Sequence, residues 1–216
     1  MAVPRFTPKE RALVDRLRTP LEVQAWLNKL PYNWERKGPT ARTFRGVVRH
    51  GTAHCFEAAL SAATILEQHG YPPLLLDIES VDLLDHVLFL HEEDGRWGTV
   101  ARSRCIGLNG RRPVFRSIAD LVRSYMAPFI DTTGRVKAYG VLDLRDLPTG
   151  AWRLHPGNVA HVEQALRDLK HKPLPTPEAV YRKWKPRYDR WWEAHGRPAH
   201  EWPDFYPGKR HWLAPA

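Results

Sequence analysis

The spacing of hydrophobic positions changes along the chain, and each spacing predicts one kind of element. Between residues 52 and 70 apolar side chains recur every three or four positions, which predicts a helix ended by Gly70. Short apolar runs after it predict strands at 74–79, 86–92, 96–103 and 136–144. Helical signals return at 118–127, 158–170 and 177–195, and two Thr-Pro helix starts predict short helices within 8–29. We expect residues 41–50 and the tail from Gly196 to be irregular or extended.

This order of elements predicts an α+β fold. A central helix that carries Cys55 should pack against an antiparallel β-sheet, with additional helices at the N- and C-terminal ends. We expect a single domain over 1–216, because nothing in the sequence marks an internal boundary. Its parts are an N-terminal helical lead (1–39), a core (about 40–145) and a C-terminal helical, Trp-rich extension (146–216).

The dipeptide Asp94-Gly95 predicts the turn of a β-hairpin. A type I′ turn needs positive φ at both central positions, which these residue types tolerate. A two-residue loop would pair Leu90 with Thr99 and would place His86 opposite Ser103.

Composition fits a protein with a hydrophobic core and no disulfide framework. Of the 216 residues 43% are hydrophobic and 26% charged, and there are two cysteines, so we expect a reducing, cytoplasmic environment. No apolar run approaches membrane-spanning length and the first residues lack a signal-peptide pattern, so no membrane partner is expected.

Charge raises the possibility of a polyanionic partner. Lys and Arg number 33 against 24 Asp and Glu, a net charge of +9. The cations are scattered and no recognition motif is present, so nucleic acid is a possible partner but not the favoured one. Residues 111–116 predict a basic loop, and residues 181–192 mix cations with aromatic side chains. That mixture suits single-stranded nucleic acid, but the spacing of its rings favours packing of an amphipathic helix.

Cys55 is the candidate nucleophile. With Thr52 as N-cap, the thiol would occupy the third helical position, where the helix dipole and free N–H groups favour the thiolate. The alternative is a buried structural thiol, because Cys55, Ala59, Ala62 and Leu66 form one apolar stripe. His86, at the start of a strand, is the candidate base, and Ser103 is the candidate group that orients its ring.

Two histidines near Cys55 raise the question of a metal. His50, His54 and Cys55 lack the paired spacing of a structural zinc site, so no metal is expected. We expect His50 and His54 to line a groove beside the thiol instead.

The segment GTAHCFEA (51–58), followed by GYPP (70–73), DHV (85–87) and GRWGTV (95–100), resembles the core of transglutaminase-like proteins. This superfamily is related in architecture to papain-type cysteine peptidases. The resemblance covers residues 51–103 and implies that Cys55 is the nucleophile and His86 the base of a Cys-His-Asp triad. Four residues after Trp97 the family has Asp, and this chain has Ala101; Ser103 is the nearest polar replacement. Trp97 and Ala101 are therefore also expected beside the substrate groove.

Together these features predict a cysteine-dependent amide acyl-transfer enzyme: an amidase, a peptidase or a transglutaminase-like protein. Its substrate would be a peptide or another amide, and no cofactor is expected. Two alternatives stay open. The missing Asp favours a catalytically degenerate binding module, and the charge favours a basic nucleic-acid-binding protein.

Overall fold

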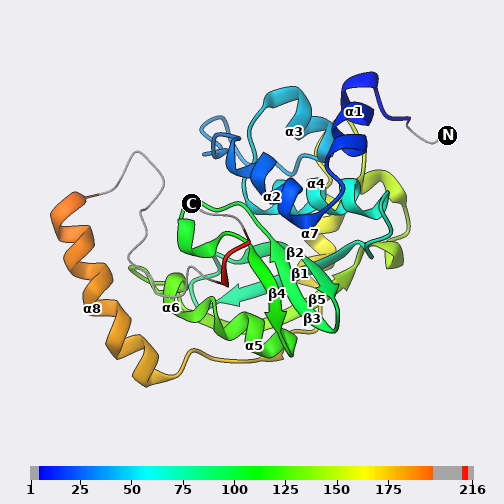
Figure 1. The fold of residues 1–216 in the computed structure, drawn as a ribbon. Coiled ribbons are helices and arrows are strands. Elements are labelled where there is room, and N and C mark those ends of the chain that lie inside the picture. The colour runs from blue at the N-terminus through cyan, green and yellow to red at the C-terminus, as the bar shows by residue number, and fades with distance from the viewer. Residues whose placement is uncertain (1–4, 197–210, 214–216) are drawn as a thin grey trace.

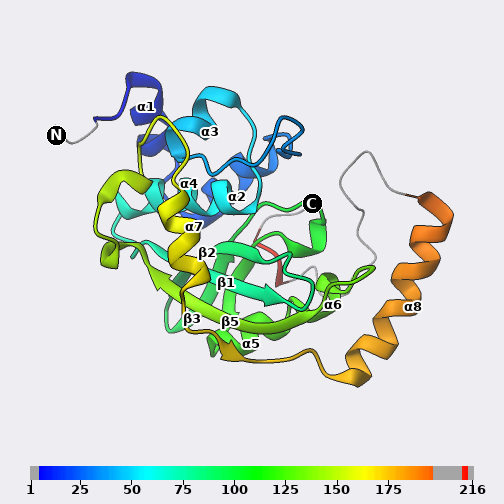
Figure 2. The same cartoon turned by 180° about the vertical axis from the view of Figure 1, so that it is seen from behind.

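The computed structural model describes residues 5–196 and 211–213, and its centre is a six-stranded antiparallel sheet with helices on both faces (Figures 1 and 2). The strands are β1 (Leu74–Ser80), β2 (His86–Glu93), β3 (Arg96–Val100), β4 (Arg111–Phe115), β5 (Val136–Asp143) and β6 (Lys172–Pro173), in the order β4-β3-β2-β1-β5-β6. The helices are α1 (Pro8–Arg16), α2 (Pro20–Asn28), α3 (Phe44–His50), α4 (Cys55–Glu67), α5 (Ile118–Arg123), α6 (Met126–Phe129), α7 (Ala160–Arg167) and α8 (Glu178–His195). Three short 3-10 helices lie between them: η1 (Ile106–Leu108), η2 (Leu144–Asp146) and η3 (Gly150–Trp152). The predicted α+β fold, with the Cys-bearing helix against an antiparallel sheet, is confirmed.

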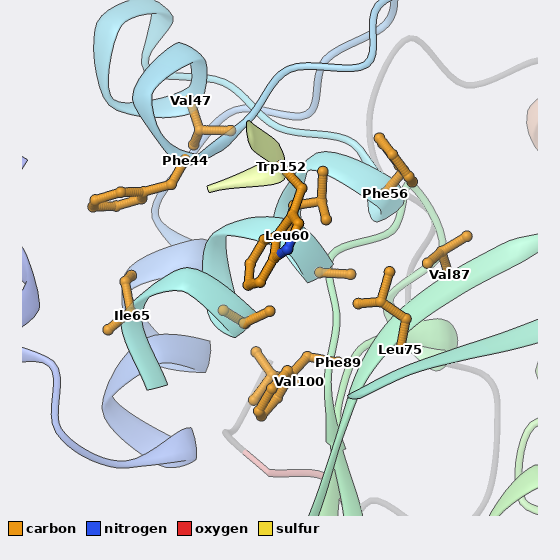
Figure 3. Packing of buried hydrophobic residues seen from close by; sticks show 14 of the residues in the cluster. Phe44, Val47, Phe56, Leu60, Ile65, Leu75, Val87, Phe89, Val100 and Trp152 are labelled. Atoms are coloured by element: carbon orange, nitrogen blue, oxygen red, sulfur yellow. The ribbon is translucent and has the colours of Figure 1, made fainter. Parts of the chain in front are cut away.

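The first face of the sheet is covered by α4, which forms the centre of the larger hydrophobic core. Leu60 of α4 packs with Leu75, Phe89 and Val100 of the sheet (Figure 3). Four alanines of this helix (Ala58, Ala59, Ala62 and Ala63) are fully buried. Their small side chains allow close approach of neighbouring elements, as expected for a central helix.

The opposite face packs against α5 and α6. Leu88 and Leu90 of β2 lie there with Tyr125, Met126 and Phe129. Beyond it, α8 runs along the outside of the molecule beside α6 (Figures 1 and 2). Trp184 and Tyr188 of α8 are buried against Ile130 and Cys105, so the aromatic positions of this helix pack, as the spacing indicated.

The β2–β3 hairpin forms as predicted but ends earlier. Asp94 and Gly95 have φ of 50° and 70°, and Leu90 pairs with Thr99. The ladder stops at the pair Phe89–Val100. After it the side-chain amide of Gln24 takes the place of a strand, since it accepts from the N–H of Ala101 at 2.9 Å and donates to its carbonyl at 2.7 Å. The chain therefore leaves β2 before Ser103 can face His86, and that predicted pair is wrong.

Two segments differ from the expected irregular structure. Residues 44–50 form α3, because burial of Phe44 and Val47 in the main core outweighs the weak helix propensity of a segment with Gly and two Val. Residues 111–115 form strand β4, so the predicted basic loop is wrong, and its Arg111 is buried. The predicted irregular tail falls mainly on residues 197–210, outside the described part of the chain. Among the described helices none is long and apolar enough to cross a membrane.

Candidate active site

A cavity of about 840 Å³ opens at the N-terminal end of α4. Its walls come from the start of α4, the ends of β1 and β2 that meet there, the segment 103–108, the turn before β5, and α7. Cys55, His54, His86 and Ser103 all line it. His50, Trp97 and Ala101 were also expected at the groove, but they lie outside the cavity lining. His50 is exposed at the end of α3, and Ala101 is fully buried. Trp97 packs against the hydrophobic core on the opposite face of the sheet from α4.

Helix α4 begins two residues later than predicted. Ala53 is held in an extended bridge with Tyr32, and the N–H of Asn33 donates to its carbonyl at 3.1 Å. The N-cap is therefore His54, and Cys55 is the first helical residue. Thr52 instead accepts a hydrogen bond from Arg42. Cys55 still lies in the first turn, where backbone N–H groups lack partners within the helix and the dipole favours a negative charge.

Glu57 is the third residue of α4, the position predicted for Cys55, and its side chain caps the start of the helix. Its carboxylate accepts from the N–H of His54 at 3.2 Å and from the Arg42 guanidinium at 2.8 Å. The Thr40 hydroxyl donates to it as well, at 2.8 Å. The Glu57 side chain is fully buried, so this network fixes the residue directly before the thiol.

Two histidines act on the Cys55 thiol. Burial raises the pKa of the thiol, but hydrogen bonds and positive charge from His54 and His86 outweigh burial and hold the pKa well below its ordinary value. Burial also lowers the pKa of His54, yet the neighbouring thiolate and Glu57 raise it to about 9. His54 is thus an imidazolium at neutral pH. Its role in the electrostatics of the thiol was missed from sequence, which placed it only in the groove.

A backbone carbonyl orients His86. Its Nε2 lies 2.8 Å from the oxygen of Leu108. A carbonyl only accepts, so Nε2 carries the proton and Nδ1 is left as the acceptor available to the thiol. The Ser103 hydroxyl is used elsewhere, accepting from the N–H of Cys105 at 3.2 Å. The predicted Ser103–His86 hydrogen bond is therefore wrong, although Ser103 lies in the same cavity.

The side chain of Arg111 holds the segment that contains Leu108 in place. This guanidinium is fully buried and donates to the carbonyls of Gly107 at 2.6 Å and Asn109 at 2.7 Å, on both sides of Leu108. It stacks on the ring of Tyr125 at 4.0 Å, and the Tyr125 hydroxyl donates to the same Asn109 carbonyl. The Tyr125 ring in turn contacts His86 edge-on. The position of the imidazole is thus fixed by a network without a carboxylate.

Tyr32 is a cavity residue that sequence reasoning missed. It is partly buried and lines the wall beside Cys55. Burial and the negative charge of Cys55 raise the pKa of its hydroxyl, so it stays protonated and can donate. Two other side chains that could donate to a reacting oxygen, Gln24 and Trp34, do not reach the cavity. Gln24 uses its amide on Asn28 and Ala101, and Trp34 lies outside the cavity lining.

Carboxylates outnumber guanidinium groups on the cavity wall. Arg104 and Arg167 line it, and so do seven acidic residues: Glu35, Asp77, Glu79, Asp82, Asp85, Asp131 and Glu163. Among the described residues, no group of three or more His, Cys, Asp or Glu side chains is arranged to hold a metal ion.

Comparison with known proteins gave no matching family model and no matching curated protein. The resemblance to transglutaminase-like proteins therefore stays a prediction from residues 51–103.

Proposed function

We propose that this protein is a cysteine-dependent enzyme that cleaves or transfers amide acyl groups. The observation that carries the proposal is the position of Cys55 at the first residue of α4, with its pKa lowered by His54 and His86 and its side chain partly exposed to the cavity. A low-pKa thiol open to a cavity is the condition for nucleophilic catalysis by cysteine.

The two histidines would have different roles. With its pKa raised to about 9, His54 is already protonated at neutral pH and cannot take up a proton, so it acts as a fixed positive charge. The proton transfers fall to His86. The thiolate attacks the amide carbonyl, the C–N bond breaks, and His86 donates its proton to the departing amine. Water or a second amine then gives a proton to His86 and attacks the thioester, which releases the thiolate.

Selective modification of Cys55 tests the nucleophile. We expect iodoacetamide at pH 7 to alkylate Cys55 at least tenfold faster than Cys105, because Cys105 is buried and Cys55 is a thiolate open to the cavity. The measurement is the rate of label uptake in each cysteine peptide by mass spectrometry as pH is varied. Cys55→Ser is the control that should leave only slow labelling. An ordinary thiol pKa for Cys55, above about 8, would contradict the proposal.

The hydroxyl of Tyr32 and the N–H of Cys55 are the proposed donors to the oxyanion. We expect Tyr32→Phe to slow acylation by p-nitrophenyl acetate roughly tenfold, since acylation passes through a tetrahedral oxyanion. Alkylation by iodoacetamide forms no oxyanion, so its rate should not change. Equal losses in both reactions would show that Tyr32 acts on the thiol rather than on the oxyanion.

One observation favours a second candidate, a binding module built on the same fold. Ala101, where the resembled family has Asp, is fully buried with its backbone tied to Gln24. The imidazole of His86 is accordingly held by a neutral carbonyl, which stabilises an imidazolium less than a carboxylate does. Acylation no faster than that of a free thiol would favour this candidate.

A further inference from the structure

Asp77 of β1 has an unsatisfied oxygen in the wall of the cavity. The residue is 3% exposed and lines the cavity that contains Cys55. Its Oδ2 lies 3.0 Å from Nε2 of His171, but Oδ1 is buried and has no hydrogen-bond partner among the described residues. A buried carboxylate oxygen without a donor is costly, and the N–H of a bound cation is the donor that suits it best.

His171 cannot supply that donor. Its Nδ1 lies 2.8 Å from the carbonyl of Leu169, so both ring nitrogens already face acceptors. Any N–H of the ring is therefore directed at the Leu169 carbonyl or at Oδ2, and none is left for Oδ1.

Further acidic residues stand next to Asp77. Asp85 lines the same wall, and its carboxylate accepts a hydrogen bond from the backbone N–H of Ser80 at 2.8 Å. This donor is neutral, so it leaves the charge of Asp85 uncompensated. Glu79 pairs with the exposed Lys137. Burial, the charge of Asp85 and the charge of Cys55 raise the pKa of Asp77 to about 6 despite its bond to His171. The cavity is thus crowded with negative charge, although the chain as a whole carries +9.

We propose that the cavity selects substrates in which an alkylammonium or guanidinium group lies next to the amide, and that Asp77 and Asp85 hold this cation. The inference rests on the proposed function for the attack by Cys55, but the charge selection is a separate property of the wall. The same carboxylates would repel a phosphate, so a polyanion attracted by the net charge of +9 should not bind in this cavity.

Charged thiol reagents test the selection. Methanethiosulfonates that carry an aminoethyl group, which is a primary ammonium at neutral pH, or an ethylsulfonate group react with the same thiol by the same chemistry and differ in the charge of that group. The measured quantity is the rate constant of the cationic reagent divided by that of the anionic reagent. We expect this ratio to be at least tenfold larger for Cys55 than for the free thiol mercaptoethanol. Asp77→Asn and the solvent-exposed Asp85→Asn should each lower this ratio on the order of fivefold. Asp94→Asn, in the β2–β3 turn outside the cavity, is the matched control and should leave it unchanged.

Binding of a matched pair of compounds tests the ligand class without any reaction. We expect calorimetry to detect binding of N-acetylarginine amide but no binding of the isosteric, neutral N-acetylcitrulline amide. Asp77→Asn should weaken the binding of N-acetylarginine amide. A reagent ratio near one, or equal binding of the two compounds, would overturn the inference. Slow reaction of Cys55 with every reagent would instead overturn the proposed function, since the ratio does not depend on the absolute rate.

Discussion

Replacing His86 with asparagine should raise the pKa of the Cys55 thiol and nearly abolish acylation. Arg111 still holds the carbonyls on both sides of Leu108, so the fold around residue 108 should persist, but the positive charge beside the thiolate is lost. An opposite charge at this range lowers a pKa by about 1–3, so we expect a rise of that size. Acylation by p-nitrophenyl acetate should fall on the order of a hundredfold or more, because the proton acceptor is lost as well.

The pH profile gives the sign of the effect. In the wild-type protein the lowered thiol pKa keeps alkylation by iodoacetamide nearly constant down to acidic pH. In His86→Asn the decline should begin at a higher pH. His50→Asn, exposed and outside the cavity lining, is the matched control and should reproduce the wild-type profile. His54→Asn should also raise the thiol pKa but should lose much less acylation. Equal acylation losses in the His54 and His86 variants would contradict the division of roles.

Replacing Glu57 with glutamine should have the largest effect on stability. The carboxylate is fully buried and neutralises Arg42, whose side chain is 12% exposed, so the variant leaves a nearly buried guanidinium without its counter-charge. Breaking such a pair costs about 3–5 kcal/mol of unfolding free energy, measured by urea denaturation at pH 7. Glu67→Gln, at the other end of α4 in a more exposed pair with Arg153, is the control and should cost at most about 1 kcal/mol.

The same variant carries a pH signature. Hydrogen bonds and charges from Arg42, His54 and Thr40 outweigh burial and lower the pKa of Glu57 below 4.5. A lowered carboxyl pKa contributes stability that is present above the unfolded value and is lost as pH falls through the folded value. The difference between wild type and Glu57→Gln should therefore be full at pH 7 and shrink below about pH 4. A difference that does not change with pH would mean that packing, rather than charge, accounts for the loss.

Local signals in the sequence were sufficient for the first two helices and for the hairpin that carries His86. The two Thr-Pro helix starts form as predicted, each with a capping box at Thr7 or Thr19, and Asp94-Gly95 sets the register of the hairpin on which His86 lies. These features depend on neighbouring residues alone, so their physics is contained in a few consecutive positions.

The errors arise where distant segments compete with local preference. Thr52 is a good N-cap, but the bridge between Ala53 and Tyr32 holds the backbone extended and moves the helix start to His54. The group that orients His86 is a main-chain carbonyl, and every residue has one, so no residue type marks it in a sequence. Strand β4 was missed because its charged residues favoured a solvated loop, and the outermost position of β4 in the sheet tolerates Pro113.

The segment 211–213 links the end of the described chain to the imidazole of His86. Leu213 donates to the carbonyl of Gly110 at 3.1 Å, and Trp212 forms a bridge with Arg111, the residue that clamps both neighbours of Leu108. Local unfolding of this segment would free the clamp, and the clamp is what aims the ring at Cys55. We therefore expect docking of the segment to be coupled to the reactivity of the thiol: a fusion partner that pulls residues 211–213 away should slow alkylation of a cysteine more than 150 positions earlier in the sequence.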